Sequence, residues 1–298
     1  MSSYLQLPPG WRRISTEGPG RFVTSELLRR PDGTLVRWGS RSHRRGHAAA
    51  IAPARSVVSG GEPVWWRPHH RDWWMSILFC AGALCFAVAA LASQWANPGA
   101  WIDATFFVGS IMFTFAAYLQ YLETVNVEHG LTSDAHRQRW RPASWEPRRV
   151  DWLAAIIQLI GTLFFNLSTF AALRHGLSTH QINRRVWAPD VFGSVCFLLS
   201  SELAYAEVCH RWICLRSRSL PWRIVALDLL GSIAFGVAAI ASLVEPSSGL
   251  PVSARIANSG TALGGVCFFL AALALMPEAA AEEQSAHDDD AHRAHVSS

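Results

Sequence analysis

Six long apolar stretches, separated by polar segments, set the pattern of the chain. They run from about 73–93, 101–122, 151–173, 188–209, 222–244 and 256–277. Each is close to the ~20 apolar residues that cross the hydrocarbon layer of a bilayer as a helix. Tryptophans stand at many of their ends, where indoles favour the headgroup region. The pattern predicts an all-α membrane protein with six transmembrane helices, in a membrane domain spanning 71–278.

The apolar stretches also repeat in sequence. In the odd-numbered spans a tryptophan is followed by a glycine and then a phenylalanine at fixed spacing, as Trp73-Gly82-Phe86, Trp152-Gly161-Phe165 and Trp222-Gly231-Phe235. In the even-numbered spans a glycine precedes a phenylalanine and a later glutamate, as Gly109-Phe113-Glu123, Gly193-Phe197-Glu207 and Gly264-Phe268-Glu278. Because a unit of two helices starts and ends on the same side of the membrane, each copy has the same orientation. We therefore expect three tandem helical hairpins, at about 72–130, 151–209 and 221–278.

The repeated glycines are predicted helix-packing positions. Glycine has no side chain, so two helix backbones approach closely where it lies. Six positions fit this description: Gly82, Gly109, Gly161, Gly193, Gly231 and Gly264.

The two ends of the chain differ from the spans. Residues 1–70 form a basic segment, of which 1–20 look irregular. Two β-prone runs flank Pro31-Asp32-Gly33 and predict a small β-hairpin from about Arg21 to Ser40. Residues 41–63 have the composition of a linker. The acidic, low-complexity residues 279–298 are predicted to be a disordered tail.

Arginine predicts the orientation of the spans. All 26 basic residues are arginine; twelve precede the first span, five lie between the second and third, and three between the fourth and fifth. The alternate loops carry none, three and one. By the positive-inside rule both termini, and with them the β-hairpin segment, are cytoplasmic.

The arginine-rich N-terminal segment also suggests a partner. Tryptophans lie among its arginines, a pattern that fits nucleic acid as well as an anionic membrane surface. Beside a membrane, the N-terminal arginines favour the anionic inner leaflet. The expected partner is therefore the lipid bilayer and not nucleic acid, and a homo-oligomer stays open.

The hairpins resemble a known bacterial module. Gly109-Ser110 and Gly193-Ser194 begin a Gly-Ser-x-x-Phe motif, which is similar to that of the YrhK-like domain, a short two-helix membrane module. The resemblance covers about 73–278 and implies a multi-pass protein of the bacterial plasma membrane. The family has no assigned activity, so the resemblance implies no catalytic residue and no cofactor.

Polar side chains inside the spans are the candidate functional residues, because burying them in lipid is costly. Gln158 and Asp228 both lie six residues after a repeat tryptophan, on the glycine–phenylalanine stripe of their helices. Glu202, Tyr118 and Gln120 lie at a similar depth. One hypothesis is a polar layer in the cytoplasmic third of the membrane that binds a proton or cation. The alternative is hydrogen bonding between helices.

Several kinds of chemistry have no support in the sequence. It holds no phosphate-binding loop, dinucleotide fingerprint, HExxH or GxSxG motif. The six cysteines form no CxxC pair, so we expect small buried side chains and neither a metal site nor a disulfide framework. Asp72 and Asp151 begin predicted helices and are expected to stabilise their N-termini.

These observations favour a non-enzymatic structural, scaffold or sensor protein. The alternative is a small-solute or ion transporter that uses the polar layer. A membrane enzyme is a third class, for which the sequence offers no nucleophile with a base.

The orientation is testable with reporter fusions. We expect fusions at residues 97, 180 and 250 to report outside, and fusions at 135, 216 and 290 to report inside, because arginine-rich loops stay in the cytoplasm. A fusion at 180 that reports inside would contradict this topology, since its loop carries three arginines.

Overall fold

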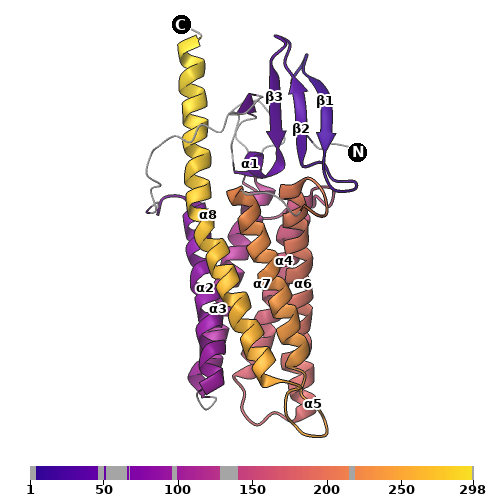
Figure 1. Ribbon diagram of the computed structural model, residues 1–298, viewed down its shortest axis with the longest axis vertical. Coiled ribbons are helices and arrows are strands. Elements are labelled where there is room, and N and C mark those ends of the chain that lie inside the picture. The colour runs from indigo at the N-terminus through magenta and orange to yellow at the C-terminus, as the bar shows by residue number, and fades with distance from the viewer. Residues whose placement is uncertain are drawn as a thin grey trace.

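The computed structural model describes residues 5–45, 50–51, 66, 68–95, 99–127, 140–214 and 219–296. Its main body is a bundle of six helices long and apolar enough to cross a membrane, as predicted (Figure 1). They are α2 (Arg71–Trp95), α3 (Ala100–Val125), α4 (Val150–Ala172), α6 (Ala188–Cys209), α7 (Leu220–Ala241) and α8 (Ala254–Val296). The short α5 (Thr179–Ile182) and a π-helical turn, Asn183–Trp187, precede α6 and continue into it.

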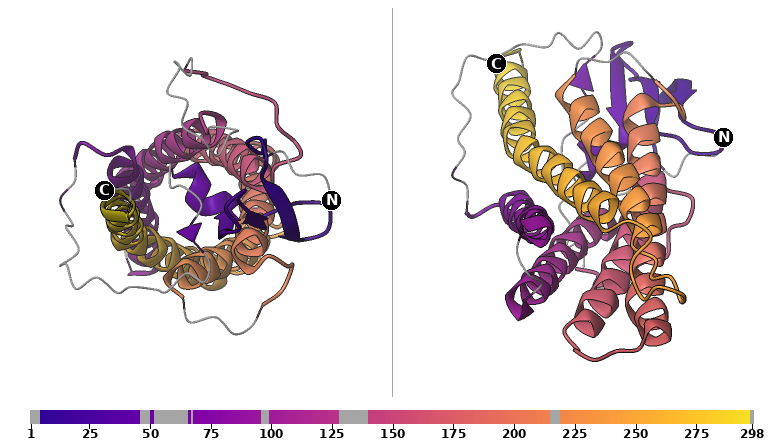
Figure 2. Two further views of the ribbon diagram at one scale, coloured as in Figure 1. Left: turned by 90° about the horizontal axis from the view of Figure 1, so that it is seen from above. Right: turned by 60° about the horizontal axis from the view of Figure 1, so that its bottom comes forward.

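The six helices form a closed ring (Figure 2). Each packs against the next along the chain, and α8 returns to pack against α2. The hairpins are therefore α2–α3, α4–α6 and α7–α8, arranged around one axis. Both ends of the described chain lie at the same end of the bundle, beside the strands of a small N-terminal domain (Figure 1). We call this end of the bundle the domain-side end.

Glycine allows the two helices of each hairpin to touch. A Cβ atom added to Gly82 would lie 3.0 Å from the carbonyl oxygen of Gly109. The corresponding distances are 3.1 Å from Gly193 to the Gly161 oxygen and 3.2 Å from Gly231 to the Gly264 oxygen. Side chains at these positions would push the helices apart, so the glycines set how closely the hairpins close.

Six phenylalanines, one from each helix, fill the axis of the ring. Phe86, Phe165 and Phe235 form one triangle with ring centroids 5.7–6.2 Å apart. A second triangle, 5.8–6.1 Å on a side, joins Phe113, Phe197 and Phe268. Within each hairpin the two rings are 4.9–5.6 Å apart, which stacks one triangle on the other. The sequence repeat thus appears as an approximate three-fold axis with an aromatic centre.

Two repeat tryptophans form hydrogen bonds to the loops that precede their helices. Trp152 and Trp222 each donate from Nε1, over 3.1 Å, to a carbonyl in the loop before their helix, that of Ser144 or Cys214. The hydroxyl of Tyr205 donates to the same Cys214 carbonyl. These hydrogen bonds fix the entry of α4 and α7 at the domain-side end.

The N-terminal domain is a small antiparallel sheet in the order β1-β2-β3-β4. Its strands are β1 (Arg12–Glu17), β2 (Ser25–Arg29), β3 (Leu35–Gly39) and β4 (Ala50–Ile51). The predicted hairpin corresponds to β2 and β3. The expectation that 1–20 are irregular was wrong, because β1 pairs with β2. Nearly all side chains of β1 are exposed, so no apolar alternation marked it.

Two further segments differ from their predictions. Residues 40–44, placed mostly in the linker, form the helix α1 (Ser40–Arg44). Of the remaining linker, 46–49 and 52–63 lie outside the described residues. α8 does not end near 277 but passes through Pro277 and continues to Val296, where a disordered tail was expected. The residues after Pro277 include six alanines and three glutamates up to Val296, residue types that favour helix.

The packing role of the glycines is testable with a matched pair on α7. Gly231→Leu should lower the free energy of unfolding by about 1–3 kcal/mol through overpacking, because a Cβ there would lie 3.1 Å from the Phe268 ring. Gly236→Leu, on the same helix with nothing within 4 Å, should be nearly neutral. Thermal unfolding in detergent gives the comparison, and equal losses for the two variants would contradict the packing account.

Candidate functional site

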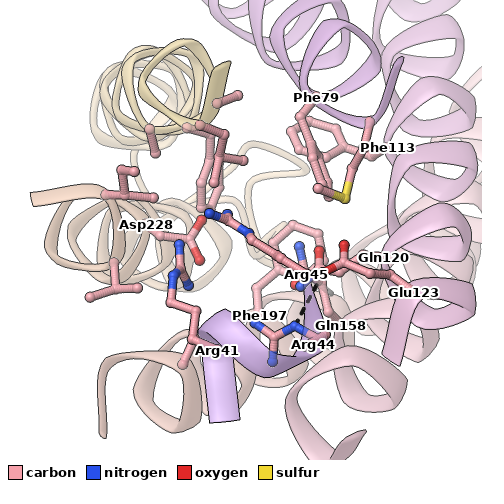
Figure 3. A pocket seen from close by; sticks show the side chains of 18 residues that line it. Arg41, Arg44, Arg45, Phe79, Phe113, Gln120, Glu123, Gln158, Phe197 and Asp228 are labelled. Carbon is pink, nitrogen blue, oxygen red and sulfur yellow. Dashed lines mark ion pairs between the residues drawn. The ribbon is translucent and has the colours of Figure 1, made fainter. Parts of the chain in front are cut away.

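A cavity of about 90 Å³ lies on the axis at the domain-side end, between the phenylalanines and α1 (Figure 3). All six membrane helices contribute to its wall. Its apolar part includes Phe79 and the triangle Phe113, Phe197 and Phe268. Its charged part includes three arginines: Arg41 and Arg44 from α1, and Arg45 directly after it.

The structure brings three of the five predicted polar-layer residues to this cavity. Gln120, Gln158 and Asp228 line it, and Phe79, the third residue at the repeat position of Gln158 and Asp228, lines it too. Glu202 and Tyr118 lie outside the lining. Glu202 is half a turn out of phase with Gly193, and Tyr118 is 40% exposed on the outside of the ring.

Hydrogen bonds from α6 hold the two polar residues at the repeat position. Ser200 Oγ donates to Gln158 Oε1 over 3.3 Å, and Ser201 Oγ donates to Asp228 Oδ2 over 3.3 Å. Both bonds cross from one hairpin helix to another. They therefore match the interhelical hydrogen bonding that was the alternative to an ion-binding layer.

The glutamates that end the three repeats all meet the N-terminal domain. Arg41 donates to both carboxylate oxygens of Glu278, from Nε over 3.1 Å and from Nη2 over 2.8 Å. Arg45 also donates to Glu278, over 2.8 Å. The Glu278 side chain is only 3% exposed, so two arginines neutralise one buried carboxylate.

Arg44 bridges the other two hairpins. Its Nη1 lies 3.2 Å from Glu207 Oε1, and its Nε lies 3.4 Å from Glu123 Oε1. Ser40 Oγ adds a hydrogen bond to Glu207 Oε1 over 2.6 Å. We call α1 and Arg45 together the arginine plug, since they reach one glutamate of every hairpin.

Asp151 is a further member of this cluster. Arg44 Nη1 lies 3.4 Å from Asp151 Oδ2, and the buried Arg149 donates to both Asp151 oxygens. Arg149 also donates to the Thr124 carbonyl at the end of α3, over 3.0 Å. Asp151 was predicted only as a helix N-terminal residue, but it joins the plug to the buried Arg149, which in turn contacts the end of α3.

Arg44 stays positively charged although its side chain is buried. Burial disfavours the guanidinium ion, but the carboxylates of Glu207, Asp151 and Glu123 outweigh it and raise the pKa of Arg44. A buried cation held by several carboxylates is strongly coupled to them. Removing either side leaves an uncompensated buried charge.

The loop after α6 forms a second contact with the N-terminal domain. His210 ends α6 in a left-handed conformation, φ 56°. Its Nδ1 lies 2.8 Å from the Thr24 hydroxyl, and burial lowers the pKa of His210, which favours the neutral ring. The indole of Trp212 lies beside Gly20.

A disulfide joins Cys209 to Cys214 and closes this loop. The expectation that cysteines serve only as small buried side chains was therefore wrong for this pair. The turn at His210 brings the two cysteines together although they are five residues apart. The CxxC spacing sought in the sequence does not include such a pair.

The charged groups of this site pair with one another across the contact between the N-terminal domain and the bundle. Among the residues that the structure describes, no three His, Cys, Asp or Glu side chains are grouped so that they could hold a metal ion. The arginine plug was missed in the sequence, where 41–45 resembled linker. The glutamate at the end of each repeat was a usable signal, because three carboxylates buried at one end of a bundle require cations.

Comparisons with protein-family models, curated proteins and solved structures found no match to this chain. The resemblance to the YrhK-like module thus stays a prediction that rests on the hairpin motif.

Proposed function

We propose that this chain is a non-enzymatic, multi-pass protein of the bacterial plasma membrane, with both termini in the cytoplasm. It is a sensor or scaffold whose N-terminal domain docks on the membrane bundle. The observation that carries the proposal is the arginine plug, whose three arginines pair with the glutamate of each hairpin.

The position of the plug suits a sensor. Glu123, Glu207 and Glu278 belong to the first, second and third hairpin, so the plug contacts all three at once. A change in how the hairpins pack moves these carboxylates relative to one another. Buried ion pairs depend steeply on geometry, so such a change alters docking of the domain. By reciprocity, a ligand of the domain alters the packing of the hairpins.

The aromatic centre of the bundle also supports a non-transporting role. Each of the six axial phenylalanines is at most 6% exposed, and together they occupy the axis directly below the cavity. A polar solute passing along the axis requires both triangles to separate, with loss of their packing. The exposed arginines Arg12, Arg29 and Arg37 of the N-terminal strands are the proposed contacts with the anionic inner leaflet.

Docking can be tested through cleavage by trypsin, which cuts after arginine. We expect wild type in lipid nanodiscs to be protected after Arg44 and Arg45, whose side chains are 10% and 6% exposed. Glu278→Gln leaves two arginines without their buried partner. Breaking such a pair costs about 3–5 kcal/mol, so cleavage there should accelerate at least tenfold.

Glu202→Gln is the matched control for this experiment. It makes the same chemical change on a membrane helix but outside the cavity lining, and it should leave cleavage unchanged. Mass spectrometry of the fragments identifies the cut sites. Rapid cleavage after Arg44 in wild type, or no difference between the two variants, would contradict the proposed docking.

The second candidate function is transport of a small solute, proton or cation. The specific observation for it is that Asp228, Gln158 and Gln120 line one cavity. An acidic group beside amide side chains in a buried cavity can exchange a proton or hold a cation.

Asp228→Asn separates the two functions. The amide keeps an acceptor for the Ser201 hydroxyl but cannot titrate. If Asp228 only joins helices, thermal stability of variant and wild type should respond in the same way to pH and to cation concentration. A response present in wild type and lost in Asp228→Asn would favour the transporter.

A further inference from the structure

We propose that the Cys209–Cys214 disulfide is a redox switch that controls docking of the N-terminal domain on the bundle. This inference rests on the proposed docking function and names its regulation. It concerns the segment from Cys209 to Cys214 after α6, which contacts the sheet through His210.

The disulfide closes the loop that presents the second docking contact. Between the two cysteines lie His210, which contacts Thr24 of the sheet over 2.8 Å, and Trp212, which lies beside Gly20. Two residues before Cys209 is Glu207, which accepts from Ser40 over 2.6 Å and pairs with Arg44. The bridge is therefore next to both sets of contacts that hold the domain.

The first hairpin shows what the bridge replaces. Val125 follows Glu123 at the same spacing at which Cys209 follows Glu207, and both side chains are buried. After Val125, Asn126 holds the returning chain by hydrogen bonds: Nδ2 donates to the Arg141 carbonyl over 2.9 Å, and the Arg141 amide donates to Oδ1 over 2.8 Å. The second hairpin has His210 in place of Asn126 and a covalent bond in place of these hydrogen bonds.

The position of the disulfide argues against a permanent structural role. The loop is on the side that the positive-inside rule assigns to the cytoplasm. Disulfides there are rare, and those that form are usually transient and redox-sensing. The remaining cysteines, Cys80, Cys85, Cys196 and Cys267, are free and lie inside the membrane helices.

The switching reaction is thiol–disulfide exchange with a dithiol reductant. The Cys214 sulfur is the accessible target, since Cys214 is partly exposed whereas Cys209 is buried. A thiolate of the reductant attacks this sulfur, forms a mixed disulfide and releases the Cys209 thiolate. The second thiol of the reductant then displaces Cys214. The reductant becomes a disulfide, and its two electrons and two protons end on the two cysteines.

Reduction frees the backbone between Cys209 and Cys214. His210 then no longer has to remain in its left-handed conformation, which non-glycine residues adopt at a cost. The contacts of the loop with Thr24 and Gly20 weaken, and the arginine plug alone holds the domain. We therefore expect a tightly docked oxidised form and a more readily released reduced form.

The test compares tryptic cleavage after Arg44 in oxidised and reduced full-length protein in nanodiscs. Reduction should accelerate this cleavage about tenfold or more, since loss of a disulfide raises the open population by such factors. Cys209→Val reproduces Val125 of the first hairpin and removes the bridge while keeping an apolar side chain. It should be cleaved like the reduced wild type, with or without reductant. Cys196→Ala, a free cysteine on the same helix, should retain the redox response.

The outcomes separate this inference from the proposed function. Protection after Arg44 in both oxidised and reduced protein would overturn the switch and leave docking intact. Rapid cleavage in the oxidised protein would overturn docking and the switch with it. Free thiols at Cys209 and Cys214 after treatment with an oxidant, detected by mass spectrometry, would also overturn the switch.

Discussion

Neutralisation of buried carboxylates is the constraint on which this structure depends. Each copy of the hairpin ends in a glutamate, and closing the ring brings Glu123, Glu207 and Glu278 to one end of an apolar bundle. Glu207 and Glu278 are 2% and 3% exposed. An unpaired buried charge is strongly destabilising. The arginine plug supplies the cations, which explains why five residues of helix outside the membrane lie against all three hairpins.

Below this charged end, the repeat produces a symmetric interior and a diverged cavity. The glycine contact and the two axial phenylalanines recur in every hairpin, because close packing of two helices allows little variation. The position six residues after the repeat tryptophan has changed instead, to Phe79, Gln158 and Asp228. These three line the cavity next to the plug. Divergence is thus found where the bundle meets the N-terminal domain.

The sequence was informative about periodic features and much less so about contacts between distant segments. The spans followed from the length of the apolar stretches, and the hairpin repeat and the glycine positions from spacing. The region of the β2–β3 hairpin followed from two β-prone runs around a turn. The convergence of Gln158 and Asp228 followed from their shared repeat position, whereas Glu202, placed by depth and not by phase, lies elsewhere. The arginine plug could not be located, because a five-residue helix in an Arg-Ser-rich stretch has no periodic signal. The Cys209–Cys214 bridge depends on the backbone turn at His210, which spacing does not encode.

The coupling free energy between Arg41 and Glu278 tests the central claim most directly. The two side chains form two hydrogen bonds, of 3.1 and 2.8 Å, between the N-terminal domain and α8. A double-mutant cycle with Arg41→Gln and Glu278→Gln, measured by unfolding in detergent, isolates their interaction. If the domain docks, the double variant should lose less unfolding free energy than the two single variants lose together, by about 1–3 kcal/mol. Losses that simply add would show that the arginine plug does not contact the bundle in the folded protein.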